Sequence, residues 1–259
     1  MDIVVVVKLV PDLVEELVVD ESGTALDTSS LRLIVNEMDN HSIEQAVLLK
    51  ERYGGQVTII APDLEGVDDV LFTAAAKGAD RLIRLTGELG GVSNHALCNS
   101  LASIIKEIKP QLVMTGVQAN TDLDGSVGPR LAALLDMTYV GYVSGVTPAA
   151  DGGSVAGGVM VRKEYAGGLV AQMLVQLPAV LGIQAADKPP RYVPISKIRQ
   201  MSKSARITDR PAGIQIAGRS AAIKRMYKPE AAAHATMIEG EVDEVADRLV
   251  AIFKEQGIV

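Results

Sequence analysis

The residues best suited to chemistry lie in one small, polar stretch of the chain, Gly116–Gly128. It reads Gly-Val-Gln-Ala-Asn-Thr-Asp-Leu-Asp-Gly-Ser-Val-Gly and separates a predicted buried strand from a predicted helix. Such a loop delivers backbone N–H groups at a helix N-terminus, and this arrangement suits a phosphate group. Ser126 adds a hydroxyl donor, while Asp122 and Asp124 can order the loop through hydrogen bonds to nearby N–H groups. The same pattern is also typical of an ordinary strand-to-helix loop with capping aspartates.

The rest of the sequence shows no recognisable catalytic machinery. Neither a Walker P-loop, a GxGxxG fingerprint nor a pyrophosphatase-type SGGxDS loop is present, and no Ser/His/Asp arrangement or acid–base pair stands out. Cys98 falls within an amphipathic helical pattern, which favours a small buried hydrophobic residue over a nucleophile. His41, His95 and His234 are too scattered to indicate a metal cluster. These features favour a nucleotide-binding module without catalytic groups of its own.

Composition narrows the class further. With 259 residues, we expect one large domain or one domain with an appendage. Hydrophobic residues make up 48% and charged residues 22%, so the chain can build a core. It has no Trp, two Phe and a net charge of −7, which disfavours a nucleic-acid surface built on stacked aromatics. The single cysteine excludes an internal disulfide and a cysteine zinc site.

No targeting or membrane segment is predicted, and we expect a cytoplasmic protein. The opening residues MDIVVVVK carry Asp2 where a signal peptide has positive charge, and the apolar run is too short. The uncharged stretch 165–186 is long enough to raise the question of a membrane span. It contains Gly167, Gly168 and Pro178, and its apolar residues alternate, so we predict a buried sheet segment instead.

The first 140 residues alternate strands and helices, which predicts a doubly wound, mostly parallel sheet of the α/β class. A helix opens near Asp39, which could cap it with Met38 and Ile43 forming a hydrophobic staple. Gly-rich hairpins follow over 141–177. The predicted strands are Ile3–Val7, Leu31–Val35, Val57–Ala61, Arg81–Leu85, Leu112–Val117 and Pro178–Gln184, and the other predicted helices are Val67–Lys77, Ser93–Lys109 and one with Pro129 at its first position.

The C-terminal part has a different character. Residues 186–230 hold 11 basic and three acidic residues, a charge of +8, and show several prolines but no helical period. A final helix over 241–256 places Val242, Val245, Leu249 and Phe253 on one stripe. We therefore divide the chain into a nucleotide-binding domain, 1–185, and a basic extended arm with a C-terminal helix, 186–259. The basic segment is either a solvated linker or an arm that packs on a protein partner, because the acidic remainder would repel nucleic acid.

In a doubly wound sheet, ligands bind beyond the carboxyl ends of the strands at a switch point. Three loops qualify here: the end of Ile3–Val7, the stretch Asn36–Asp39, and Gly116–Gly128.

Along nearly its whole length, the sequence resembles the β subunit of electron transfer flavoprotein. The resemblance is carried by short stretches whose order and spacing are specific together: Val4–Lys8, Asn36–Ala46, AAAKGAD at 74–80, GVQANTDLDGSVGPRLA at 116–132, LPAV at 177–180, PRY at 190–192, and 225–259 with RMYKPE and the closing helix.

The resemblance implies an adenine nucleotide α-hydrolase-like fold and a heterodimer. In the family, the α subunit holds the redox-active FAD, and the β subunit helps to form that site and wraps the partner with its arm. The β subunit's own site holds AMP, or a second FAD in electron-bifurcating members. Carried over to this sequence, that site is lined by Val6, Asn36, Glu37, Met38, Asp39, Ala61, Gly116, Val117, Gln118, Asn120, Thr121, Asp122, Asp124, Gly125, Ser126 and Val127.

The sequence departs from the family pattern at several of these positions. Family members commonly have Gln where Ser126 stands, and bifurcating members resemble DGDTAQVGP where this chain has TDLDGSVGP. The aromatic residues near the partner's flavin are replaced by Leu13 and Met38. These departures leave open whether AMP or FAD occupies the β site.

Two functions therefore stand as hypotheses. The first is an electron-carrier subunit, not itself an enzyme, which takes electrons from dehydrogenases and passes them to a quinone-linked acceptor. The second is a stand-alone nucleotide-binding protein without redox function. The basic arm favours the first. Within it, Ile195 lies beside Pro194 at a position that in the family is an aliphatic anchor for partner dehydrogenases; the alternative is that Ile195 packs on this protein's own sheet.

Overall fold

The structure of the protein is a computed structural model, and it describes residues 1–122, 125–149, 158–213, 223–229 and 235–258. The chain divides into two compact units. The larger comprises Met1–Val18 and Leu26–Ala222, and the smaller comprises Val19–Ala25 and Ile223–Val259.

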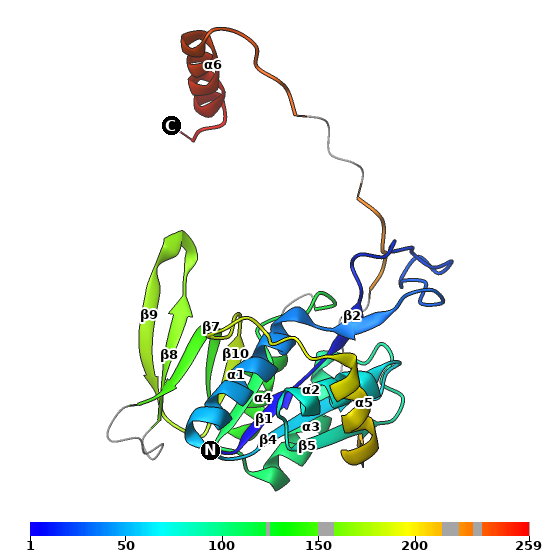
Figure 1. The fold of residues 1–259 in the computed structure, drawn as a ribbon. Helices are drawn as coiled ribbons and strands as arrows, with labels where there is room; N and C mark the ends of the chain where they lie inside the picture. The colour runs from blue at the N-terminus through cyan, green and yellow to red at the C-terminus, as the bar shows by residue number, and fades with distance from the viewer. Residues whose placement is uncertain (123–124, 150–157, 214–222, 230–234, 259) are drawn as a thin grey trace. The chain divides into compact units, whose positions relative to one another are not determined.

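A nine-stranded sheet forms the centre of the larger unit, in the order β11-β5-β4-β1-β6-β10-β7-β8-β9 (Figure 1). All neighbouring pairs are parallel except β7–β8 and β8–β9, which are antiparallel. The nine strands are β1 (Ile3–Val6), β4 (Val57–Pro62), β5 (Arg81–Thr86), β6 (Leu112–Gly116), β7 (Thr138–Pro148), β8 (Val159–Glu164), β9 (Val170–Val175), β10 (Ala179–Ile183) and β11 (Ile207–Pro211).

Helices cover both faces of this sheet. Four of the six helices described belong to the β/α alternation: α1 (Glu37–Tyr53), α2 (Val67–Lys77), α3 (Asn94–Ile108) and α4 (Val127–Leu135). Ile3 and Val5 of β1 share a core with α1 and α2, and Val4 and Val6 share the opposite core with α3 and α4. A strand buried on both faces is what the β-branched run predicted. The predicted α/β, doubly wound fold is thus confirmed.

Local sequence accounts for the helix ends. Helix α2 has the predicted bounds and stops at Gly78, whose φ of 132° suits glycine. Helix α3 begins after Ser93, whose hydroxyl accepts a hydrogen bond from the N–H of Ala96 (3.4 Å). Helix α4 begins at Val127, so Pro129 is its third residue rather than its first. The N–H groups of a first turn have no partner within the helix, so proline is tolerated there as well.

Helix α1 opens near Asp39 as predicted, but the predicted cap and staple are wrong. The residue at the N-cap is Asn36, the helix already includes Asp39 in its first turn, and the predicted staple between Met38 and Ile43 therefore falls out of position. The carboxylate of Asp39 instead accepts hydrogen bonds from N–H groups outside the helix, described below.

The segment 165–186 divides into two strands of different character. Strand β10 is fully buried between β6 and β7. Strand β9 is the edge strand, and most of its residues are exposed, so the prediction of a buried segment is wrong there. In Figure 1, β8 and β9 project as a hairpin beyond the neighbouring strands. A smaller antiparallel sheet pairs β2 (Leu9–Pro11) with β3 (Leu33–Val35).

The basic segment is more ordered than predicted. Residues expected to be extended form helix α5 (Ile195–Ser204), which packs on α2, and strand β11, which adds to the sheet beside β5. Arg84 of β5 fixes this edge through a bidentate contact with Asp209 of β11, at 2.9 and 3.1 Å. The helical period was hidden because only Ile195, Ile198 and Met201 form an apolar stripe among polar residues.

In the smaller unit, the N–H of Met226 donates to the carbonyl oxygen of Gly23 (2.7 Å). Its helix α6 (Val242–Glu255) confirms the predicted C-terminal helix, and none of its residues is buried. The predicted domain of residues 186–259 stays a prediction, since it refers to the chain wrapped on a partner.

Candidate functional site: the crevice at the strand ends

The strand order reverses at β1, which has β4 on one side and β6 on the other. The chain leaves these strands in diverging directions, so a crevice opens beyond their carboxyl ends. The ends of β1 and β6 lie in register, with Val5 opposite Met114. The three loops predicted to meet here do meet: Lys8 follows β1, Asn36–Asp39 opens α1, and Gly116–Val127 joins β6 to α4.

Asp39 ties two strand ends together. Its Oδ2 accepts a hydrogen bond from the N–H of Lys8 (2.8 Å), and its Oδ1 accepts one from the N–H of Gly116 (2.6 Å). Only 3% of the residue is exposed. Burial disfavours the charged carboxylate and raises the pKa of Asp39 to about 6, although both N–H bonds and the nearby Lys8 ammonium act in the opposite direction.

The close approach of these elements requires glycine at position 116. A Cβ there would lie 2.5 Å from Asp39 Oδ1 and 2.9 Å from Met38 Cβ. Asn36 adds a second tie, because its Nδ2 donates to the carbonyl oxygen of Gln118 (3.0 Å). The start of α1 therefore holds the start of the 116–128 loop.

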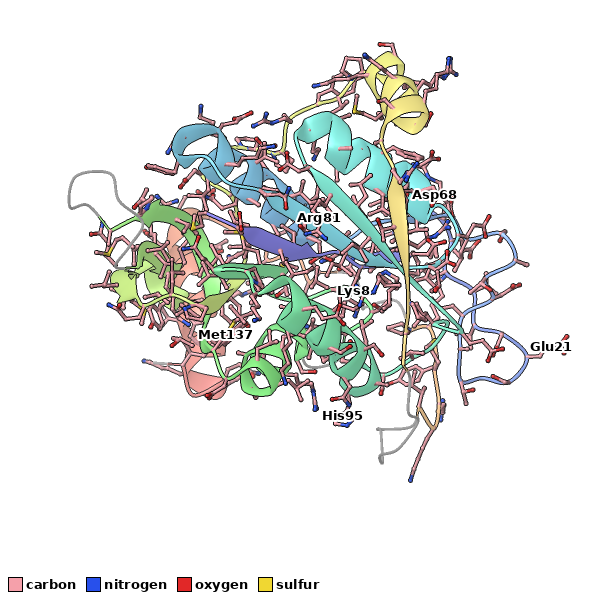
Figure 2. The ribbon with its side chains drawn as sticks, turned by 90° about the horizontal axis from the view of Figure 1, so that it is seen from below. Lys8, Glu21, Asp68, Arg81, His95 and Met137 are labelled. Carbon is pink, nitrogen blue, oxygen red and sulfur yellow. The ribbon has the colours of Figure 1, made fainter. Side chains whose placement is uncertain are left out.

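A cluster of one cation, one amide and one carboxylate, Lys8, Asn94 and Asp122, closes the crevice on its other side. Lys8 Nζ lies 2.5 Å from Asp122 Oδ1 and 3.1 Å from Asn94 Oδ1, and Asn94 Nδ2 donates to the same Asp122 oxygen (3.0 Å). The Asp122 side chain is only 4% exposed. Asp122 thus orders the loop through a cation and an amide, whereas we expected backbone N–H groups, none of which donates to its carboxylate among the described residues. Figure 2 shows Lys8 inside the α/β unit. His95, which follows Asn94 in α3, lies at the outer edge of that unit.

Lys8, Asn94 and Thr115 are site residues that the sequence analysis did not single out. Lys8 could have been found, because it is a cation placed directly after the buried strand at the switch point. Asn94 gives no such signal. It opens α3, and the loop after β5 was not among the three considered.

The second half of the loop turns sharply. Gly125 has a φ of 56°, and a Cβ there would lie 2.9 Å from the carbonyl oxygen of Val117. Ser126 occupies the N-cap position of α4, and its hydroxyl accepts a hydrogen bond from Arg130 Nε (3.0 Å). Asp124, which was also predicted to line the site, lies outside the described residues.

The remaining predicted residues fall into two groups. Val6, Val117 and Val127 are buried around the crevice, Ala61 is buried in the core as part of β4, and Glu37, Gln118, Asn120 and Thr121 are exposed. Leu13 is exposed as well. Cys98 is buried within α3, as predicted, and its thiol donates to the carbonyl oxygen of Val127 (3.6 Å).

One polar atom inside the crevice has no partner. Among the residues that the structure describes, Thr115 Oγ1 is buried and has no hydrogen-bond partner. Thr115 is one of the residues that line a cavity of about 10 Å³, together with Val6, Lys8, Asp39, Gly116, Gln118, Ala119, Asp122 and Val127. That space holds about one water molecule. A larger ligand could enter only where the contact between Lys8 and Asp122 opens.

The part of the chain that the structure describes shows neither a cluster of metal ligands nor a helix able to span a membrane. Among the residues that the structure describes, no group of three His, Cys, Asp or Glu side chains could hold a metal ion. Within the same residues, no helix is long and apolar enough to cross a bilayer.

Comparison with known proteins gives one consistent result. The family model described as "Electron transfer flavoprotein domain" matches residues 24–213. The electron transfer flavoprotein subunit beta of Methylophilus methylotrophus is 29% identical over 266 residues, covering 98% of each chain. The protein of the same name from Clostridium acetobutylicum is 29% identical, covering 99% of each chain. Protein FixA of Azorhizobium caulinodans is 28% identical, covering 99% of this chain and 95% of its own.

Proposed function

The chain belongs to the electron transfer flavoprotein family, and from this membership we propose that it is the β subunit of a heterodimeric electron transfer flavoprotein. In this role it carries electrons from dehydrogenases to a quinone-linked acceptor in the cytoplasm. The observation that carries the proposal is the match to proteins named subunit beta over nearly the whole of both chains.

The crevice at the strand ends is the proposed site for AMP. Three features fit a nucleotide there: the unpartnered hydroxyl of Thr115, the Lys8 ammonium, and the close backbone approach at Gly116 and Gly125. A phosphate would compete with Asp122 for Lys8, because both are anions. Asp39 and Asn36 would keep the start of the loop, Gly116 and Gln118, attached while the contact between Lys8 and Asp122 opens to admit the ligand.

The FAD is proposed to lie mainly in the α subunit, where it supplies the redox chemistry of the complex when bound. This chain contributes by positioning the nucleotide and the partner subunit. It holds the nucleotide at the switch point and presents surfaces to the partner, and we propose no catalytic step for its own side chains.

Two apolar surfaces support a partner chain. Helix α6 has 14 residues and buries none of them, although isolated helices of this length are only marginally stable in water. The β8–β9 hairpin exposes Leu169, Val170 and Leu174 at the edge of the sheet. Exposed apolar edge strands are otherwise prone to aggregation, so a covering partner explains both surfaces.

The test is the nucleotide content of the complex. We expect the chain, co-expressed with the flavoprotein α subunit from its own genome, to co-purify with it. Chromatography of the denatured complex should release FAD and AMP in equal amounts. FAD alone, at twice the amount of the complex, would establish the electron-bifurcating alternative. A monomer that retains nucleotide but never acquires a flavin-binding partner would show a stand-alone nucleotide-binding protein.

A further inference from the structure

A second and larger cavity lies apart from the crevice and shares no lining residue with it. It has a volume of about 630 Å³, within the range of small-molecule sites. Residues 28–35, which include β3, form one wall. Helix α2, from Glu65 before its start to Lys77 at its end, forms another, and Asn40 and Ile43 of α1 complete it.

The inner end of this cavity holds a buried cation. Lys77 is only 5% exposed, and its ammonium donates to Asn40 Oδ1. An ammonium has three N–H donors. Among the residues that the structure describes, no carboxylate oxygen lies within 4.0 Å of it, whereas Lys8, Lys50 and Arg191 all have such partners.

The nearest acidic group does not satisfy Lys77. The Glu44 carboxylate exerts a favourable charge on it from a distance, but Glu44 is held by Arg191, whose guanidinium lies 2.9 Å away. Arg191 repels the ammonium in turn, and burial is the main cause that lowers the pKa of Lys77. A buried ammonium without an ion-pair partner is costly, and an anion in the cavity would remove that cost.

The remaining lining defines the rest of the ligand. Thr73 lies one helical turn before Lys77 and places a hydroxyl on the same wall. The other lining residues are mixed: Leu31, Leu33, Ile43, Val70 and Ala74 are apolar, whereas Thr28, Ser29, Ser30 and Arg32 are polar. Arg32, Glu65 and Asp69 line the cavity and are exposed to solvent, and their combined charge of −1 disfavours a polyanion such as a phosphate dianion.

We propose that this cavity binds a small monocarboxylate with an apolar body, whose carboxylate contacts the Lys77 ammonium and the Thr73 hydroxyl. One buried cation matches one negative charge, and a charge-assisted hydrogen bond is about twice as strong as a neutral one. The apolar body packs against Leu31, Ile43 and Val70.

The test measures binding of hexanoate to the full chain in its purified complex, by titration calorimetry or saturation-transfer NMR. We expect saturable binding of hexanoate, at least tenfold weaker binding of hexanamide, and no displacement of hexanoate by inorganic phosphate. Lys77→Met should weaken hexanoate binding at least tenfold. Lys50→Met is the matched control, because Lys50 is paired with Asp80 and does not line the cavity; it should leave hexanoate binding unchanged.

Several outcomes would overturn the proposal. The proposal is wrong if hexanoate shows no saturable binding up to about 10 mM. A dissociation constant of that size corresponds to a binding free energy of only ~3 kcal/mol. Equal binding of hexanamide would show that Lys77 takes no part, and this comparison uses the unmodified chain, so it decides even where Lys77→Met does not fold. Displacement by phosphate would show the wrong ligand class. AMP content of the complex is a separate readout that reports on the crevice, and flavin content reports on the partner subunit.

Discussion

At the level of single residues, the crevice depends most on Asp39, because its two oxygens accept N–H bonds from the ends of two different strands. The raised pKa gives this carboxylate a distinct linkage to folding. An acid whose pKa is higher in the folded than in the unfolded state binds its proton more tightly when folded. Its contribution to stability therefore increases as the pH falls through 6 and levels off below the unfolded value, near 4.

The prediction compares the wild-type chain with Asp39→Asn by urea unfolding at pH 7 and pH 5. From Asp39 alone, the free energy of unfolding should be about 1 kcal/mol higher at pH 5 than at pH 7. Asp39→Asn should lose this increment and be less stable at both pH values, because its amide NH₂ would face an N–H donor. The same pH dependence in both proteins would contradict the role of Asp39.

Gly125 provides the second prediction at this scale. Gly125→Val should sharply reduce AMP retention in the complex, because a β-branched residue is strained at a φ of 56° and its Cβ would press on the carbonyl oxygen of Val117. Cys98→Ala is the control, since Cys98 is buried behind the loop and should retain nucleotide. Equal retention in the two variants would remove the phosphate-loop assignment.

At the level of elements, residue patterns predicted those helices and strands whose position depends on the residues within them. The β-branched run of β1, the glycine after α2 and the apolar spacing of α3 each fixed an element that the structure contains. The predictions were wrong where tertiary contacts decide. Helix α5 has no buried residue and was hidden by its polar sequence, and β9 has the alternation of a core strand but lies at the edge of the sheet.

Helix α5 presents Ile195, which is 64% exposed in the first turn. The segment before it is anchored by Arg191, which contacts Glu44 (2.9 Å) and Glu51 (2.5 Å) of α1. A rigidly anchored, exposed aliphatic side chain binds a partner at low entropic cost, and the basic residues nearby would steer an acidic partner.

We therefore predict that Ile195→Ala slows electron transfer from the donor dehydrogenase at least tenfold while leaving the melting temperature and the flavin content unchanged. Truncation of a central interface anchor typically costs about 2 kcal/mol or more. Ile198→Ala is the control, because Ile198 is partly buried one turn further on and should lower the melting temperature with little effect on transfer. A lower melting temperature with normal transfer in Ile195→Ala would show that Ile195 is a packing residue.

At the level of the whole molecule, the sequence predicted where the crevice lies but not which side-chain contacts close it. The switch-point rule selected three loops after predicted strands, and the strand order that the structure shows places those loops beside β1, where the order reverses. The contacts that close it join Lys8, Asn94 and Asp122, which are separated by as many as 114 positions in the sequence. Such pairings appear only once the strands are side by side, so no local pattern could show them.

The last prediction concerns the smaller unit and its helix α6. Among the described residues, neither hydrophobic core of the larger unit includes one beyond Ala212, so we do not expect α6 to be needed for that fold. Its apolar stripe, which includes Leu249 and Phe253, is available to the α subunit. The double variant Leu249→Ser and Phe253→Ser should thus keep the melting temperature of the isolated chain and lose co-purification with the flavin-binding partner. The control, Asp247→Ser and Lys254→Ser, changes two charged residues of the same exposed helix and should retain the partner. If the apolar double variant binds the partner normally but unfolds at a lower temperature, α6 packs within its own chain, and the assignment of α6 to the subunit interface is wrong.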